Sequence, residues 1–244
     1  MTEPTAPPAP VPGLFSRAIA VIVAPRPLFE KLVLSPKVIG ALLAVGVVIG
    51  LSQGLPQLTA TGRQAALDAQ VQQTERFTGR AVTEEQYAQM QRFAPLRAYA
   101  TLIFAPAGVA LMTLIMGGVF YVIFNVVLGG TATYKQMLTV LAHSGFISAL
   151  GAVLGAVVQH FQGVLTPTGP FTLAALAPTL DESTFLARML SFINVFSIWG
   201  TIVTAIGLSV LYRRKTTNIA IGLLTLMVLV SAGFAAVFGL FSGR

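Results

Sequence analysis

Five long apolar runs dominate the sequence and limit the folds open to it. Each has about 20 residues or more, the length an α-helix needs to cross about 30 Å of hydrocarbon. Their central parts contain no Asp, Glu, Lys or Arg. Because backbone groups in lipid must bond internally, we predict an all-α membrane protein with five transmembrane helices. The predicted spans cover about residues 37–57, 98–128, 136–159, 188–212 and 219–241.

The charge content supports a membrane location. Only 9% of the residues are charged, whereas an ordinary soluble domain has roughly 25%, so a soluble enzyme is excluded. The net charge is +7, and the basic residues flank apolar runs, as membrane topology requires. They form no dense basic face of the kind that binds nucleic acid. The absence of Cys excludes thiolate metal sites and Cys nucleophiles.

Two segments precede the first predicted span. Residues 1–13 are rich in Pro, and we predict a disordered tail that is not a signal peptide. Residues 14–36 are apolar but interrupted by Pro25 and Pro27. Each half is about 15 Å of helix, too short to span. We predict short interfacial amphipathic helices here; packing against the rest of the chain is the alternative.

The connections between the spans predict the orientation. Residues 58–97 form a polar loop with nearly balanced charge, and Thr83 to Gln86 predict a capped helix start within a helical hairpin. The turn 213–215 is short and basic, which favours a cytoplasmic amino terminus and an external carboxyl terminus. Expected contacts with anionic headgroups come from Arg17, Arg26, Lys31, Arg213, Arg214 and Lys215.

Glycines recur at intervals of four in two of the runs. Gly46, Gly50 and Gly54 form a ridge on one helix face, and Gly151 and Gly155 repeat the spacing. Such ridges let helix backbones approach closely. We favour packing within the chain over dimerisation through residues 37–57, and self-association or binding of other membrane proteins stays open.

A few polar side chains lie within the runs, at Asn125, His143, Asn194, Ser197 and Thr201. In lipid they must find partners, either as interhelical hydrogen bonds or along a solute path. We predict no catalytic residue, metal site or cofactor. The two His are about 25 Å apart along one helix, and no HExxH motif or pair of intramembrane Asp is present.

Three stretches resemble one family. Residues 129–136 (GGTATYKQ) are similar to the glycine–aromatic–Lys–Gln turn of the Yip-one domain family. Residues 194–199 (NVFSIW), followed by Gly207, resemble its fourth span, in which Trp199 and Gly207 would serve helix packing. Residues 25–29 fit the Pro-then-Phe helix that precedes its first span.

The resemblance implies a five-helix bundle with a cytoplasmic amino end and no catalytic residues. Eukaryotic members bind Rab-type GTPases in vesicle traffic. This chain has a very short amino-terminal region and an enlarged loop at 58–97, so it is more similar to the prokaryotic branch and Rab binding is not carried over. The resemblance to that branch implies a bacterial inner membrane. We expect a non-enzymatic scaffold or membrane-organising protein; the alternative is a small-solute or lipid transporter.

Overall fold

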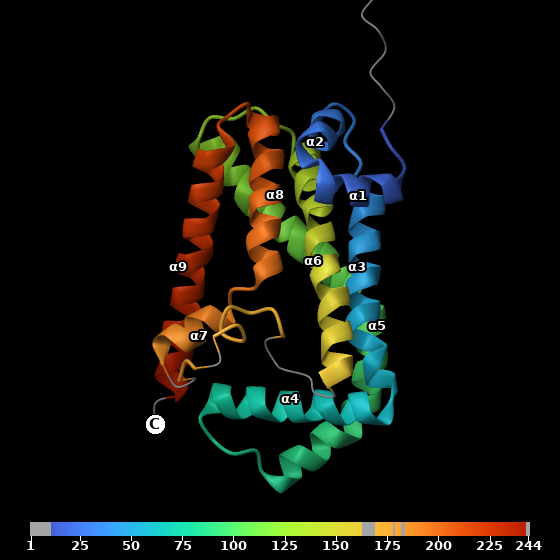
Figure 1. Ribbon diagram of the computed structural model, residues 1–244, viewed down its shortest axis with the longest axis vertical. Helices are drawn as coiled ribbons and strands as arrows, with labels where there is room; N and C mark the ends of the chain where they lie inside the picture. Colours follow the sequence, from blue (N-terminus) through green and yellow to red (C-terminus); the bar gives the residue numbers. More distant parts are fainter. Residues whose placement is uncertain (1–10, 163–168, 178, 182–183, 243–244) are drawn as a thin grey trace, which may run out of the picture.

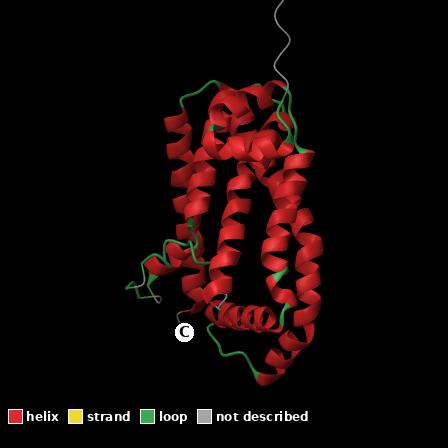
Figure 2. Ribbon diagram, turned by 45° about the vertical axis from the view of Figure 1, so that its right-hand side comes forward, coloured by secondary structure: helices red, strands yellow, loops and turns green. Residues whose placement is uncertain are grey.

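Long helices form the body of the protein (Figure 1). The structure is a computed structural model that describes residues 11–162, 169–177, 179–181 and 184–242. Within these residues there is no β-strand (Figure 2), and five helices are long and apolar enough to cross a membrane. The predicted all-α fold with five spans is therefore confirmed. The elements are α1 (Leu14–Val23), α2 (Pro25–Leu34), α3 (Ile39–Gly54), the 3₁₀ turn η1 (Pro56–Leu58), α4 (Ala60–Thr78), α5 (Glu84–Tyr121), the π-helical turn η2 (Val122–Val127), α6 (Tyr134–Gln162), α7 (Phe185–Ser191), α8 (Val195–Tyr212) and α9 (Thr216–Ser242).

The bundle has two unlike ends. Helices α1 and α2 lie at one end, which we call the amino end, with the connections 128–133 and 213–215 (Figure 1). Helices α4 and α7 and the last turns of α9 lie at the opposite end, which we call the hairpin end. The first described helix and the last turns of α9 thus lie at opposite ends, as an odd number of crossings requires. Of the predicted disordered tail, residues 1–13, the first ten residues lie outside the described part of the chain.

Proline divides the segment before the first span into two helices. Helix α1 ends at Val23, and α2 begins with Pro25 in its first turn. A proline ring disfavours helical geometry in the residue before it, and Ala24 accordingly has φ −149° and ψ 63°. The predicted pair of short helices is present.

The second span extends further than its hydropathy suggested. Helix α5 begins at Glu84 rather than near residue 98, and it continues through Pro95 and Pro106. A capping box holds its start: the Thr83 hydroxyl accepts from the Gln86 N–H, and the Gln86 side chain accepts from the Thr83 N–H. The predicted capped start is confirmed. Hydropathy marks where a helix meets lipid, not where it begins, so the sequence predicts a helix start at Thr83 but not that this helix continues into the second span.

The prediction of one continuous span over residues 188–212 is wrong. The chain forms α7, breaks at residues 192–194, and starts α8 at Val195. The Asn194 side chain accepts from the Phe196 N–H at 2.8 Å, while the Asn194 N–H donates to Ser197 Oγ at 3.1 Å. These local bonds compete with helix continuation and fix a helix start. Hydropathy does not detect this because the flanking residues are apolar.

Candidate functional site at the amino end

The glycine ridge of α3 is covered by α5. A Cβ built on Gly46 would lie 2.6 Å from the Cα of Pro106, and one on Gly50 would lie 3.1 Å from the Cβ of Ala105. A Cβ on Gly54 would lie 2.6 Å from Cγ of Leu102. The two backbones approach closely along the whole ridge. This face is occupied by the chain itself, so it offers no dimerisation surface while α5 stays in place.

The other predicted packing glycines receive side chains from neighbouring helices. A Cβ on Gly151 would lie 2.6 Å from the ring of Phe196. A Cβ on Gly207 would lie 2.5 Å from Val140 and 3.2 Å from the ring of Phe29. Gly155 has more room, with Pro170 at 3.8 Å. Trp199 is half-buried on α8, with its ring 6.3 Å from that of Phe196.

The five residues of the predicted polar path do not come together at one place in the bundle. Asn125 bonds at the amino end, where its amide donates to the Ala132 carbonyl at 2.6 Å. Asn194 and Ser197 bond to each other at the start of α8, and Thr201 is half-buried further along that helix. His143 lies on α6 and is fully buried. The arrangement supplies no shared polar cavity among these described side chains.

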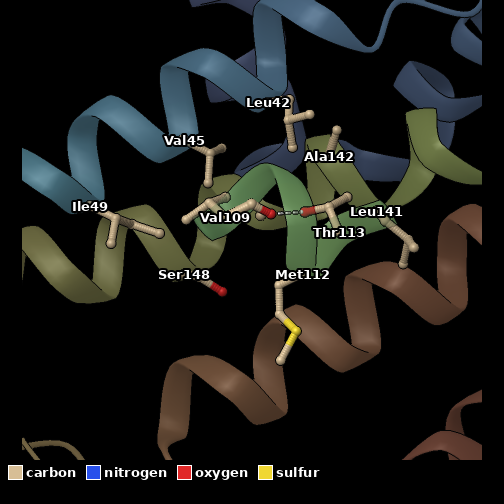
Figure 3. A pocket seen from close by; sticks show the side chains of 10 residues that line it. Leu42, Val45, Ile49, Val109, Met112, Thr113, Leu141, Ala142 and Ser148 are labelled. Carbon is tan, nitrogen blue, oxygen red and sulfur yellow. Dashed lines mark hydrogen bonds between the residues drawn. The ribbon is translucent and has the colours of Figure 1, made fainter. Parts of the chain in front are cut away.

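A groove between α3, α5 and α6 has a volume of about 190 Å³ (Figure 3). Its wall is mostly apolar, and the Thr113 hydroxyl donates to the Val109 carbonyl of its own helix at 2.8 Å. None of the five predicted path residues lines it. The lining residues are Leu42, Val45, Ile49, Val109, Met112, Thr113, Leu141, Ala142, Gly145 and Ser148.

The most unusual contact in the described structure joins α1 to the interior of α6. Arg17 Nη1 lies 3.0 Å from Nε2 of His143, and Nδ1 of His143 lies 2.8 Å from the Thr139 carbonyl oxygen. A carbonyl only accepts, so Nδ1 carries a proton and donates to it. A guanidinium only donates, so Nε2 is the unprotonated acceptor. The contact geometry therefore requires a neutral imidazole.

The environment of Arg17 differs from the one expected. The sequence placed it among headgroup-binding cations, but its guanidinium turns inward, and Nε is buried with no partner among the described atoms. Burial lowers the pKa of Arg17, yet an arginine keeps its charge in proteins. Sequence reasoning missed the pair because its members are 126 residues apart.

Two further polar links close the same end. The Gln136 amide at the start of α6 donates to the Val33 carbonyl in α2 at 2.9 Å. The Tyr212 hydroxyl at the end of α8 donates to Oδ1 of Asn125 at 2.8 Å, and its ring stacks on Phe124 at 5.0 Å between centroids. Asn125 lies in η2, and π-helical turns are frequent at functional sites. These contacts join α6 to α2, and α8 to η2, at the amino end.

Comparison with known proteins identifies the family. A family model for the Yip1 domain matches residues 19–238. The chain belongs to the Yip1 domain family. It is 29% identical over 233 residues to a protein called membrane protein YknW from Bacillus subtilis (strain 168), covering 95% of this chain and 90% of the relative. No solved structure matches. The chain is thus an integral, multi-pass Yip1-family membrane protein similar to a bacterial relative.

Apolar side chains anchor α2 in this Yip1-family bundle. Phe29 and Leu32 are fully buried, and Leu28 is nearly so. The ring of Phe29 packs toward Gly207 of α8, in the space that a side chain there would fill. From α1, Val21 is also fully buried and belongs to the same apolar core. The inner faces of α1 and α2 therefore pack against the protein itself. Packing against the rest of the chain was the alternative to interfacial helices in the sequence analysis.

The outer face of α1 is apolar as well. Phe15, Ile19 and Val23 lie along one side of the helix and are 79%, 46% and 71% exposed. Helix α1 runs across the end of the bundle (Figure 1), so this side faces away from the core. An exposed apolar face on a helix in this position suits the boundary between headgroups and acyl chains. We call α1 and α2 together the cap.

Charges are distributed unevenly between the two ends. The described residues of the amino end include one acidic side chain, Glu30, which pairs with Arg26 at 3.5 Å. The α4–α5 hairpin, in contrast, carries both acidic and basic side chains. No group of three or more potential metal ligands occurs among the residues searched. The basic side chains of the amino end are Arg17, Arg26, Lys31, Lys37, Lys135, Arg213, Arg214 and Lys215.

Proposed function

We propose that this Yip1-family protein is a non-enzymatic membrane-organising protein whose cap lies in one leaflet as an interfacial wedge. The observation that carries the proposal is the exposed apolar row of Phe15, Ile19 and Val23 on a helix whose opposite side is tied to the bundle. A helix held at headgroup depth enlarges the headgroup layer more than the acyl layer. Attachment to the five spans keeps it at that depth.

The basic side chains of the amino end support binding to anionic headgroups. Arg26 and Lys31 on α2 are exposed, as are Arg213, Arg214 and Lys215 in the turn after α8. Each basic group near an anionic membrane surface contributes about 1 kcal/mol to the free energy of binding to that surface. Arg17 is assigned a different role, because its guanidinium bonds to His143.

The same charges support a cytoplasmic amino end in a bacterial inner membrane. Short connections that carry Lys and Arg favour the cytoplasmic side. The turn 213–215 is short and wholly basic, and it lies at the end where the cap lies. We therefore assign the hairpin end, with its mixed charges, to the external side.

Transport is the weaker proposal. A polar path would bring its side chains to a common cavity. Instead, Asn125, Asn194 and Ser197 form hydrogen bonds to groups close to them in the sequence. The groove between α3, α5 and α6 has a mostly apolar wall. In a flux assay with reconstituted vesicles, we expect no solute transport by the wild type, and transport that Asn194→Leu abolishes would reverse this ranking.

Vesicle shape tests the wedge. The full-length protein is reconstituted at increasing density into vesicles containing anionic lipid and imaged by electron microscopy. We expect the wild type to narrow or tubulate the vesicles. A triple variant, Phe15→Asp, Ile19→Asp and Val23→Asp, is expected to leave them spherical. The matched control, with Leu at the same three positions, retains the effect. Spherical vesicles with the wild type at every density would refute the proposal.

A further inference from the structure

The contact between Arg17 and His143 has the chemistry of a proton-controlled latch. Its hydrogen bond uses the lone pair of Nε2, and the other ring nitrogen is committed to the Thr139 carbonyl. A proton added to Nε2 would remove the only acceptor that the ring offers the guanidinium. It would also place an imidazolium directly against a second cation.

We infer that protonation of His143 releases α1 from the bundle, so that α1 docks at neutral pH and undocks in acid. Docking requires the neutral ring, whereas the undocked state accepts either form because the ring is then accessible to water. Acid therefore draws the equilibrium toward the undocked state. The inference concerns only the position of α1 and holds whatever the docked helix does to the bilayer.

No other described charge offsets this effect. Helix α3 carries no ionisable side chain. The nearest ionisable side chains that α5 and α8 contribute are Tyr121 and Tyr212, at the amino-end termini of their spans. Helix α2 contributes Arg26, Glu30 and Lys31, which are all exposed. Among the helices packed on α6, the one charge in contact with His143 is thus Arg17.

Helix α1 has few other docking contacts, so the Arg17–His143 hydrogen bond can decide the equilibrium between docked and undocked α1. Helix α1 inserts one fully buried apolar side chain, Val21, and leaves Phe15, Ile19 and Val23 outside. The undocked helix keeps these three in contact with the bilayer and adds Val21 to them. The apolar gain from docking is therefore small, and the hydrogen bond from the charged Arg17 to His143 is a large part of what holds α1 in place.

The size of the response follows from proton linkage. An imidazole that meets water has an ordinary pKa of about 6.5. If only the undocked state takes up the proton, the undocked-to-docked ratio rises about tenfold between pH 7.5 and pH 5.5. The docked state is thus retained above this range and progressively lost below it.

Distance measurements between spin labels test the latch directly. The chain has no Cys, so labels attach only where Cys is introduced. Phe15→Cys on α1 and Phe161→Cys on α6 place them at side chains that are 79% and 85% exposed. In full-length protein in vesicles, we expect one distance at about pH 7.5 and a second, pH-dependent population at about pH 5.5.

Two variants assign the effect to the pair. His143→Gln keeps an oxygen that accepts from Arg17 at any pH, and we expect it to stay docked in acid. Arg17→Gln removes the charge that an imidazolium would face, and we expect it to lose the pH response as well. A reference pair, Phe161→Cys with Leu229→Cys on α9, reports the bundle itself and is expected to keep one distance throughout.

The inference is overturned if the wild type shows a single unchanged distance across this range. It is equally overturned if His143→Gln responds to acid as the wild type does, because another group would then be the sensor. A shift of the reference pair along with α1 would also contradict it, since acid would then disrupt the whole bundle. Vesicle shape plays no part in these readouts, so failure of the latch is distinguishable from failure of the proposed wedge.

Discussion

The amino end is held by contacts between residues far apart in the sequence, whereas the hairpin end is held largely by contacts between near neighbours. At the amino end, Arg17 bonds to His143, and Tyr212 bonds to Asn125, across 126 and 87 residues. At the hairpin end, Thr83 and Gln86 cap α5, and the Glu75 side chain accepts from the Val82 N–H at 3.0 Å. The hairpin therefore forms from local sequence, while the amino end forms only once the spans have assembled.

This difference predicts where the protein is sensitive. A change at the amino end affects several helices at once, because α1, α2, α5, α6 and α8 meet there through side chains. A change of the same chemical kind in the hairpin affects one or two turns. Matched pairs of substitutions at the two ends measure the contrast.

The largest contrast is expected for two phenylalanines. Phe29 on α2 is fully buried, whereas Phe161 at the end of α6 is 85% exposed. Phe29→Ala removes a core ring and leaves a cavity, and we expect it to lower the free energy of unfolding by about 3–5 kcal/mol. Phe161→Ala is expected to change it by less than about 0.5 kcal/mol. Denaturant unfolding in detergent, followed by circular dichroism, measures both. Similar losses in the two variants would contradict the contrast.

Two tyrosine hydroxyls give the next contrast. Tyr212 donates to the part-buried Asn125 at 2.8 Å, and Tyr87 meets the exposed Gln64 at 3.2 Å. Tyr212→Phe leaves the Asn125 oxygen without that donor, which we expect to cost about 1–3 kcal/mol. Tyr87→Phe should be nearly neutral because water replaces the lost bond. The same unfolding experiment decides, and a neutral Tyr212→Phe would show that the link at η2 is unimportant.

The smallest contrast concerns two helix ends with left-handed backbone. Arg213 follows α8 with φ 52°, and Gly79 follows α4 with φ 66°. Gly tolerates this region and other residues do so at a cost of about 1 kcal/mol. We therefore expect Arg213→Gly to stabilise the fold slightly and Gly79→Ala to destabilise it by a similar amount. Thermal unfolding would contradict this if both substitutions acted in the same direction.

An arginine in a strained position is informative about the amino end. Gly is the residue that a helix end of this geometry favours, and the hairpin end uses it. The choice of Arg213 agrees with the proposed need for positive charge on the cytoplasmic side. We expect Arg213→Gly to weaken binding of anionic vesicles even as it raises thermal stability. Co-sedimentation with the vesicles at low salt measures the binding.

Local sequence patterns predict much of the fold. The number of spans follows from run length and the absence of charge, the break between α1 and α2 follows from Pro25, and the start of α5 follows from Thr83 and Gln86. Each of these features depends on residues within a few positions of one another. Backbone hydrogen bonding in lipid then leaves helix as the only structure for each run.

Features that depend on tertiary contacts could not be predicted from the sequence. The ridge of Gly46, Gly50 and Gly54 indicated close packing, but its spacing does not identify α5 as the partner. The inward turn of Arg17 depends on α1 lying over α6, which no local pattern encodes. The break before α8 was visible in principle, because Asn194 and Ser197 have the spacing of a capping box, but the same two residues also fit a polar stripe.

The most direct test of the cap is the depth of its outer face in the bilayer. A spin label on Phe15→Cys, in full-length protein in vesicles at neutral pH, can be examined for collisions with oxygen, which partitions into lipid, and with a water-soluble nickel complex. If α1 lies docked as an interfacial wedge, the label should be buried about 5–10 Å into the headgroup and acyl boundary, with frequent oxygen collisions and few nickel collisions. A label that collides freely with nickel and rarely with oxygen would place α1 in water and contradict the account.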